Sequence, residues 1–286
     1  MTLNTGLQYL NFAGAQLALD YQCVSSPPTH LCILVNGYQR NRLDFRAFRK
    51  KLEKIAPHVA TVAFDNRGCG ETQIASEDNF SIEKIAQDAI AIASIFMQKL
   101  NLCTYSVLGI SMGGMIAQTI AAESHNIDNL FLVSTTCGGV GRTWSRPVAN
   151  PSQLKYVNKN TDMEATKKNM SRYFADKFLK NSGLLFEMMC KNILKTSVEN
   201  GEKNNDEIRK QYDISVHYNG VSSLNKITAK KTVIFSGDED KIIPLQNATF
   251  LKEHIKNAQL IVYPQAGHLL LIEEPEQFAQ DVGSFF

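Results

Sequence analysis

Short runs of apolar, mostly branched residues recur along the chain, each bounded by residues typical of turns. Their length and composition are those of buried β-strands. They lie at residues 31–36, 59–65, 105–110, 129–135, 231–237 and 258–264. Between them the apolar spacing predicts helices at 45–55, 82–100, 112–124, 245–255 and from Pro275 onward. This alternation predicts an α/β fold: a mostly parallel, doubly wound sheet with helices on both faces and ligands at the carboxyl ends of its strands.

The alternation stops between residues 138 and 222, where the chain carries helical patterns and no convincing strand. We therefore expect residues 1–137 and 223–286 to form the α/β core, and residues 138–222 to be a helical insertion. The insertion contains 14 Lys and Arg against 9 Asp and Glu. It therefore carries a charge of +5, whereas the rest of the chain carries −3.

Composition narrows the class of protein. The chain has 286 residues, 44% of them hydrophobic and 20% charged, which is typical of a globular protein. A net charge of +2 excludes the strongly basic surface of a dedicated nucleic-acid binder. No apolar run approaches the roughly 20 residues of a membrane span, and no Lys or Arg precedes Arg40, as a signal peptide would require. We expect a cytoplasmic protein that does not span a membrane.

The cysteine spacing and the lack of metal-binding motifs limit the kinds of site that the chain could contain. No two cysteines form a C-x-x-C pair, which predicts reduced and mostly buried thiols. No H-E-x-x-H or similar spacing points to a metal, and no complete nucleotide-binding motif is present, so we expect neither metal nor cofactor. The six cysteines are Cys23, Cys32, Cys69, Cys103, Cys137 and Cys190.

A G-x-S-x-G motif stands between a predicted strand and a predicted helix, with Ser111 at its centre. A nucleophile at such a sharp turn needs neighbours without side chains, and Gly109 and Gly113 provide that space. The helix that follows directs free amides toward Ser111. A glycine-rich turn without catalytic function is the alternative, but the flanking strand and helix favour a nucleophile.

A serine hydroxyl needs a base, and His268 is the best candidate because it follows the last predicted strand, at the same sheet edge as Ser111. The other histidines lie in turns or on helical stretches without suggestive partners: His30, His58, His125, His217 and His254. The histidine in turn needs a carboxylate acceptor. The loop after the preceding strand offers Asp238, Glu239 and Asp240.

These motifs, in the order serine, acid, histidine, resemble the α/β-hydrolase family over nearly the whole chain. In that family the acid commonly stands three residues after a glycine, which implies Asp240 after Gly237. The Asn36-Gly37-Tyr38 loop resembles the family's His-Gly-x loop, although asparagine replaces histidine. The resemblance implies an oxyanion hole formed by the backbone N–H groups of Tyr38 and Met112. The segment 65–70 resembles the family's D-x-R-G-x-G turn, which we interpret as structural.

The resemblance also implies that residues 138–222 form a cap over the active site, entered through the glycine-rich segment 137–141. An ordinary packed helix with a solvated basic face is the simpler interpretation of the pattern in this segment. The alternative is a roof for an acyl chain with a basic rim that favours an anionic group. The apolar residues are Met163, Met170, Phe174, Phe178, Leu184, Leu185, Phe186, Met188 and Met189, and the basic ones Lys167, Lys168, Arg172, Lys177 and Lys180.

The sequence therefore predicts a cofactor-free serine hydrolase with a Ser111–His268–Asp240 triad that cleaves a small-molecule ester or thioester. C–C bond hydrolases and cofactor-free haloperoxidases of the same fold also use serine and stay open. Two further classes are a ligand receptor that keeps the triad and a catalytically idle interaction protein. Oligomeric state cannot be read from the sequence.

Overall fold

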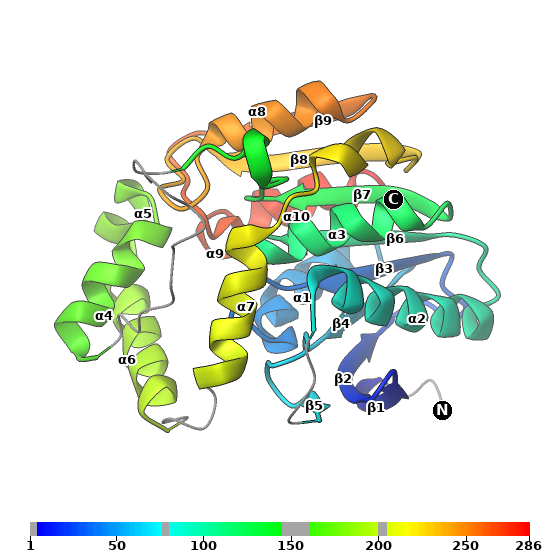
Figure 1. Ribbon diagram of the computed structural model, residues 1–286, viewed down its shortest axis with the longest axis horizontal. Coiled ribbons are helices and arrows are strands. Elements are labelled where there is room, and N and C mark those ends of the chain that lie inside the picture. The colour runs from blue at the N-terminus through cyan, green and yellow to red at the C-terminus, as the bar shows by residue number, and fades with distance from the viewer. Residues whose placement is uncertain (1–4, 76–79, 145–160, 200–204) are drawn as a thin grey trace.

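The computed structural model describes residues 5–75, 80–144, 161–199 and 205–286. Nine strands form one sheet in the order β1-β2-β4-β3-β6-β7-β8-β9, and the short β5 pairs with β2 (Figure 1). The strands are β1 (Gly6–Phe12), β2 (Ala15–Gln22), β3 (His30–Val35), β4 (Val59–Phe64), β5 (Gln73–Ile74), β6 (Tyr105–Ile110), β7 (Ile127–Val133), β8 (Lys231–Gly237) and β9 (Ala258–Tyr263). From β4 to β9 the neighbouring strands are parallel, so the predicted mostly parallel sheet is confirmed.

The predicted helices of the core are also present, with bounds within a residue or two where a bound was predicted. They are α1 (Arg46–Ile55), α2 (Ile82–Leu100), α3 (Met112–Glu123), α8 (Leu245–His254) and α10 (Pro275–Gly283), and a short α9 (Leu270–Glu273) precedes α10. Ser81 caps α2 by accepting a hydrogen bond from the N–H of Lys84. Asn101 ends the same helix in the left-handed conformation.

The sheet is buried on both faces because alternate residues of its strands enter two different cores. Ile33 and Val35 of β3 belong to a core formed with α2, α3 and α8. Cys32 and Leu34 belong to the other core, which contains Phe48 of α1 and residues of α10. The central strands must therefore be apolar along their whole length, and the sequence shows continuous apolar runs there.

The N-terminal hairpin formed by β1 and β2 was not among the predicted strands. Its seven residue pairs run antiparallel from Gly6–Tyr21 to Phe12–Ala15. Ala13 and Gly14 both have positive φ, which suits the two-residue turn of a hairpin. Alanine is not a residue typical of this turn, and β2 is buried on most positions, so neither the turn nor a clean alternation marks the hairpin in the sequence.

Helices occupy the described part of the segment between β7 and β8. They are α4 (Met163–Met170), α5 (Asp176–Asn181), α6 (Gly183–Glu199) and α7 (Asn205–His217), and Figure 1 shows the first three gathered beyond one end of the sheet. The two ends of this segment meet: the Gly139 N–H donates to Tyr218 O at 3.2 Å and the Gly220 N–H to Cys137 O at 2.8 Å. Such adjacent ends are what an insertion into a continuous core requires, and the division at 138–222 stays a prediction.

Short 3₁₀ helices complete the described elements: η1 (Arg42–Phe45), η2 (Gly139–Gly141), η4 (Ser171–Tyr173) and η6 (Val221–Lys226). None of the helices in the described ranges is both long enough and apolar enough to cross a membrane.

Candidate active site

Ser111 lies at a sharp turn between β6 and α3. Its backbone has φ 56° and ψ −118°, a conformation that a non-glycine residue rarely adopts. The turn is fixed from both sides, because the Ser111 N–H donates to Val133 O at 2.9 Å and the Thr135 hydroxyl donates to Ser111 O at 2.6 Å. This is the strained elbow that presents a nucleophile at the edge of the sheet.

The glycines of the motif are required by close approach. A Cβ on Gly113 would lie 2.7 Å from the carbonyl oxygen of Asn36, and one on Gly109 would lie 2.7 Å from the Cβ of Ala117. Real Cβ atoms essentially never approach so closely. The motif therefore allows α3 to pack directly against β3 and β6.

Asp240 and His268 are in contact. The Oδ2 atom of Asp240 lies 2.7 Å from Nδ1 of His268, and both residues are buried. The other carboxylate oxygen of Asp240 accepts the N–H groups of Ile242 and Ile243, each at 2.8 Å. These bonds hold the carboxylate in one orientation toward the imidazole, the arrangement that fixes a catalytic histidine's tautomer.

The two other carboxylates of this loop have different partners. Asp238 accepts the N–H of Gln265 at 2.7 Å, and Glu239 accepts the N–H of Asp176 at 3.3 Å. Asp240 is therefore the one in hydrogen-bond contact with His268. Ser111, Asp240 and His268 follow the carboxyl ends of the parallel strands β6, β8 and β9. Their catalytic roles stay a prediction.

The candidate oxyanion loop passes against Ser111. A Cβ on Gly37 would lie 3.2 Å from the Cβ of Ser111, so the next residue, Tyr38, follows directly beside the nucleophile. Met112 is the first residue of α3, where N–H groups have no partner within the helix. The structure thus places Gly37, and with it the loop that carries Tyr38, beside the turn that carries Ser111 and Met112. The role of the two amides toward an oxyanion stays a prediction.

Asn36 shapes this loop in place of the family's histidine. Its side-chain oxygen accepts the N–H of Gly37 at 2.8 Å, and its amide group donates to Asn41 O at 2.7 Å. The amide of Asn66 donates to Asn36 O at 2.9 Å. An asparagine can fold the loop back on itself in this way because it has both a donor and an acceptor.

The turn at residues 65–70 holds the loops beneath the site. The Asp65 carboxylate accepts the N–H groups of Arg42 and Glu71 and pairs with the Arg42 guanidinium. Arg67 pairs with Asp88 at 2.7 Å, and both side chains are fully buried. These contacts support the structural interpretation of this turn.

Burial disfavours a thiolate nucleophile at Cys69 and Cys137. All six cysteines are free. Burial raises the pKa of Cys69 to about 12 and that of Cys137 to about 11, so neither is a thiolate near neutral pH. The free cysteines agree with the prediction of reduced thiols. Of the thiols predicted to be mostly buried, Cys32, Cys137 and Cys190 are buried, whereas Cys23 and Cys69 are half-buried and Cys103 is exposed. The described residues contain no cluster of His, Cys, Asp or Glu that could hold a metal ion.

The predicted apolar stripe of the insertion forms a small core of its own. Met170, Phe174 and Phe178 are buried with Cys190, and Leu269 and Ile272 of the histidine segment pack against them. Leu184, Leu185 and Met188 are exposed instead. The buried part of the stripe is thus packed both within the insertion and against the histidine segment, which favours the simpler interpretation. The roof for an acyl chain stays a prediction.

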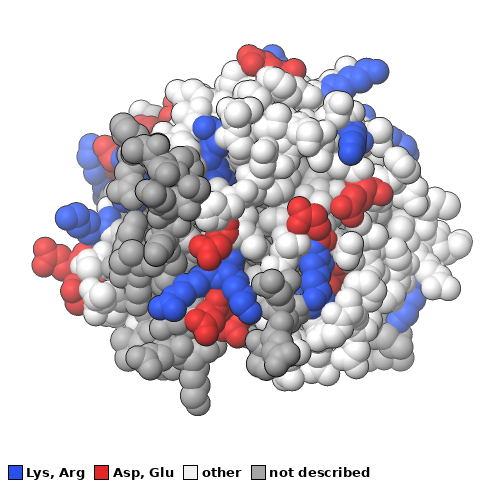
Figure 2. All heavy atoms as spheres, in the orientation of Figure 1, with Lys and Arg blue, Asp and Glu red and all other residues white. Residues whose placement is uncertain are grey.

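Two lysines of the predicted basic rim have acidic partners. Lys167 lies 3.2 Å from Glu187, and Lys177 lies 3.2 Å from Glu274. Figure 2 shows basic and acidic side chains interleaved on the face of the molecule that it presents. At the root of the insertion, Arg142 donates to Ser215 O and Val216 O at 2.8 Å each, and burial lowers its pKa to about 10.

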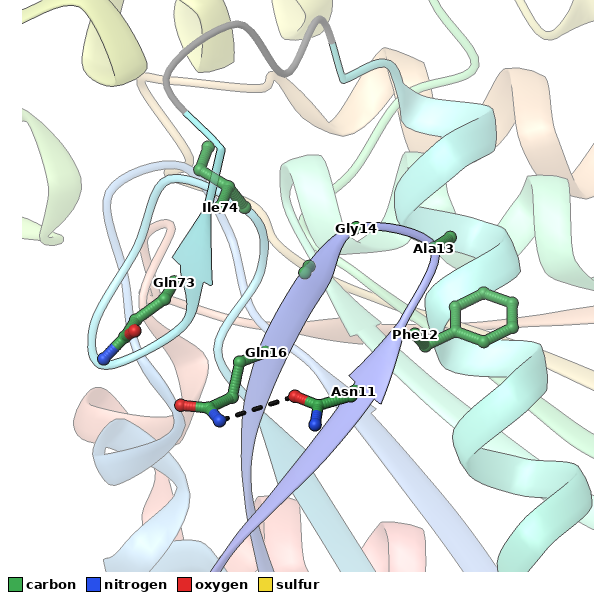
Figure 3. A pocket seen from close by; sticks show the side chains of 8 residues that line it. Asn11, Phe12, Ala13, Gly14, Gln16, Gln73 and Ile74 are labelled. Atoms are coloured by element: carbon green, nitrogen blue, oxygen red, sulfur yellow. Dashed lines mark hydrogen bonds between the residues drawn. The ribbon is translucent and has the colours of Figure 1, made fainter.

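A hollow of about 550 Å³ lies between the β1–β2 turn and β5 (Figure 3). β4 and β3 separate β2 from β6 in the sheet. The hollow is lined by apolar side chains, glycine and the amides of Asn11, Gln16 and Gln73, and its lining contains no ionisable group. We assign no chemistry to it.

Comparison with known proteins identifies the family. A profile described as alpha/beta hydrolase fold matches residues 33–275. The chain belongs to this family.

The relatives confirm the fold and an enzyme of the hydrolase class. The chain is 25% identical to a proline iminopeptidase of Pestalotiopsis fici over 97% of this chain and 98% of that protein. It is 22% identical to 3-oxoadipate enol-lactonase 2 of Acinetobacter baylyi over 92% and 90% of the two chains. The crystal structure of MGS-M2, an alpha/beta hydrolase enzyme from a deep-sea metagenome library, superposes with a TM-score of 0.78 at 16% identity, covering 98% and 97%.

Sequence reasoning missed Glu273 and Tyr173. The backbone N–H of His268 donates to Tyr173 O at 2.9 Å, and Glu273 accepts the N–H groups on either side of His268. The one local signal for Glu273 is its spacing, a carboxylate five residues after His268. Tyr173 has no such signal.

Proposed function

We propose that this protein is a serine hydrolase that cleaves a carboxylic ester or thioester through an acyl-enzyme. The observation that carries the proposal is the hydrogen bond between Asp240 and His268, at the sheet edge where Ser111 occupies the elbow. With Nδ1 bound to the carboxylate, Nε2 of the neutral imidazole is the nitrogen that accepts a proton. A serine at a strained elbow supplies that proton.

The reaction proceeds in two halves. Ser111 Oγ attacks the carbonyl carbon as its proton passes to His268, and the carbonyl π electrons move to oxygen. The N–H groups of Tyr38 and Met112 stabilise that oxyanion. The tetrahedral intermediate collapses, the bond to the alcohol or thiol breaks, and the leaving group takes the proton from His268.

Water completes the cycle. His268 accepts a proton from a water molecule, and the resulting hydroxide attacks the acyl carbon. The bond to Ser111 breaks, Oγ takes the proton from His268, and the acid is released. Asp240 stabilises the imidazolium formed in each half and does not itself become protonated.

The name of one relative, an enol-lactonase, denotes cleavage of a cyclic ester and supports an ester as the substrate. The iminopeptidase shows that relatives of equal similarity act on a different bond. Identities of 22% and 25% do not choose between them, so the bond is decided by experiment. Residues 138–222 act in the proposal as a cap over this site.

Active-site labelling and a substrate panel test the proposal. The wild-type protein should react with a fluorophosphonate and hydrolyse p-nitrophenyl esters or acyl-CoA thioesters of graded chain length. Ser111→Ala should lose both activities and keep its fold, while Ser94→Ala, a change at an exposed serine of α2, should keep both. Full labelling of Ser111→Ala would identify another nucleophile. Acylation of the wild type without turnover would indicate a ligand receptor instead.

A further inference from the structure

The side chain of Glu273 binds three backbone N–H groups. Oε2 accepts from Ala175 at 2.9 Å and from Gly267 at 3.0 Å, and Oε1 accepts from Leu269 at 3.3 Å. Gly267 and Leu269 flank His268 in the chain, whereas Ala175 lies in the insertion between β7 and β8. One carboxylate therefore joins both neighbours of His268 to a segment 98 residues distant in sequence.

The same segment of the insertion contacts His268 directly. The His268 N–H donates to Tyr173 O at 2.9 Å, and the ring of Tyr173 meets the imidazole edge-on with centroids 5.7 Å apart. A Cβ on Gly267 would lie 2.7 Å from the nitrogen of Ala175. The two segments thus pack backbone against backbone, and a small shift of residues 173–175 must be transmitted to the loop that carries His268.

The acid loop is tied to the next residue of this segment. Glu239 accepts the N–H of Asp176 at 3.3 Å, and Lys241 pairs with the Asp176 carboxylate at 2.8 Å. Residues 173–176, which we name the strap, therefore contact both the loop of Asp240 and the loop of His268. Among these contacts, Glu273 contributes the side chain that binds strap and histidine loop at once.

We propose that Glu273 is a positioning residue of the hydrolase site: its carboxylate couples the strap to the loop of His268, so that the insertion sets the orientation of the imidazole. The inference rests on the proposed function, because it assigns His268 the role of base. A hydrogen bond to a charged group contributes about 1.5–3 kcal/mol, which corresponds to about a tenfold to hundredfold effect when orientation of the base depends on it.

The charge of Glu273 provides a readout that a purely structural role would not move. A negative charge beside an imidazole favours its protonated form, so removal of that charge should shift the rise of kcat/KM with pH to lower pH. Other charged groups at this junction stay in place in such a variant and so do not produce the shift. They are Asp240, Glu239 and Lys241 of the acid loop, Asp176 and Lys177 of the insertion, and Glu274.

The experiment compares Glu273→Gln, Glu273→Ala and the control Glu274→Gln on a small neutral p-nitrophenyl ester. Gln retains an oxygen acceptor without the charge, so we expect kcat to fall about tenfold with KM within about twofold. We expect the midpoint of kcat/KM to move down by about half a pH unit. Glu273→Ala should lose about a hundredfold in kcat. Glu274→Gln removes only a surface ion pair with Lys177 and should leave kcat and the midpoint unchanged.

The outcomes separate this inference from the proposed function. A folded Glu273→Gln variant with wild-type kcat and an unshifted midpoint would overturn the inference while the wild-type enzyme remained a serine hydrolase. A wild-type protein that neither reacts with the phosphonate nor hydrolyses any ester or thioester would overturn the proposed function, and the inference with it. If Glu273→Ala unfolds, the Gln variant alone decides, because it keeps the size of the side chain.

Discussion

Asp240 and His268 are joined by a hydrogen bond of 2.7 Å in which the carboxylate is held from its other side by two backbone N–H groups. The carboxylate therefore cannot rotate away from Nδ1 without losing those bonds. Asp238, two residues earlier, is engaged by the N–H of Gln265 instead. The two acids of one loop thus have separate tasks, which a pair of matched substitutions can distinguish.

Asp240→Asn should lower kcat by several orders of magnitude, about 10⁴ by analogy with the equivalent change in serine proteases. The amide favours the wrong tautomer of His268 and does not stabilise its cation. Steady-state kinetics on a p-nitrophenyl ester measures the effect, and Asp238→Asn is the matched control, expected to stay within about tenfold. If Asp238→Asn were the crippled variant, the assignment of the acid would be wrong.

Gly113→Ala should lower both the stability of the protein and its kcat. The added methyl group meets the backbone of Val35 and Asn36, which carry the strand and loop beside the nucleophile. Overpacking of this kind costs about 1–3 kcal/mol, so thermal unfolding should begin several degrees lower. Gly183→Ala is the control, since a Cβ there meets nothing within 4 Å. Equal melting temperatures for the two variants would contradict the close approach at Gly113.

The core of the fold could be predicted because each of its strands is a single unbroken run of apolar residues. β3, β4 and β6 to β9 are apolar runs, and each is recognisable without knowledge of its neighbours. The β1–β2 hairpin could not, because its pairing depends on a turn at Ala13 that takes positive φ without the asparagine or glycine that usually indicates it.

The candidate site divides in the same way. Ser111 and His268 stand in motifs a few residues long, so the sequence alone points to them. Glu273 accepts the N–H of Ala175, which reaches it only because the insertion folds back onto the histidine loop. No local pattern encodes a contact between backbone groups so far apart in the chain. For the same reason the pairing of Lys167 with Glu187 could not be foreseen.

The stability of the protein relative to Glu273→Gln should depend on pH. Burial raises the pKa of the Glu273 carboxyl, and the nearby Asp240 raises it further, against the three backbone N–H groups, which lower it. An acid with a higher pKa in the folded state binds its proton more tightly when folded. Wild-type stability should therefore fall, relative to the Gln variant, as pH rises from about 4.3, the value for unfolded Glu, through the folded pKa.

Thermal unfolding of both proteins between pH 4 and pH 8 measures this difference, because the other ionisable groups are common to both. The gap in melting temperature should move toward the wild type at the acidic end. A gap that moved toward the Gln variant as pH fell would mean that the ionised carboxylate is favoured by folding, and the direction of the pKa shift would be wrong.

Substrate preference should be governed by chain length first and by charge second. Burial of each CH₂ contributes roughly 0.8 kcal/mol, or about fourfold in kcat/KM, until the site is full. The effect of exposed charges is smaller and is screened by salt. Of the three basic residues at positions 167–172, Lys167 already pairs with Glu187, which leaves the exposed Lys168 and the half-buried Arg172 to favour an anionic substrate. Reversing both to Glu should abolish a preference for an anionic over a neutral ester at low ionic strength and spare hydrolysis of the neutral one.

Lys252→Glu, a single charge reversal on the exposed side of α8, is the control and should retain the preference for the anionic ester. If the double variant retained it too, the basic side chains of the insertion face bulk solvent.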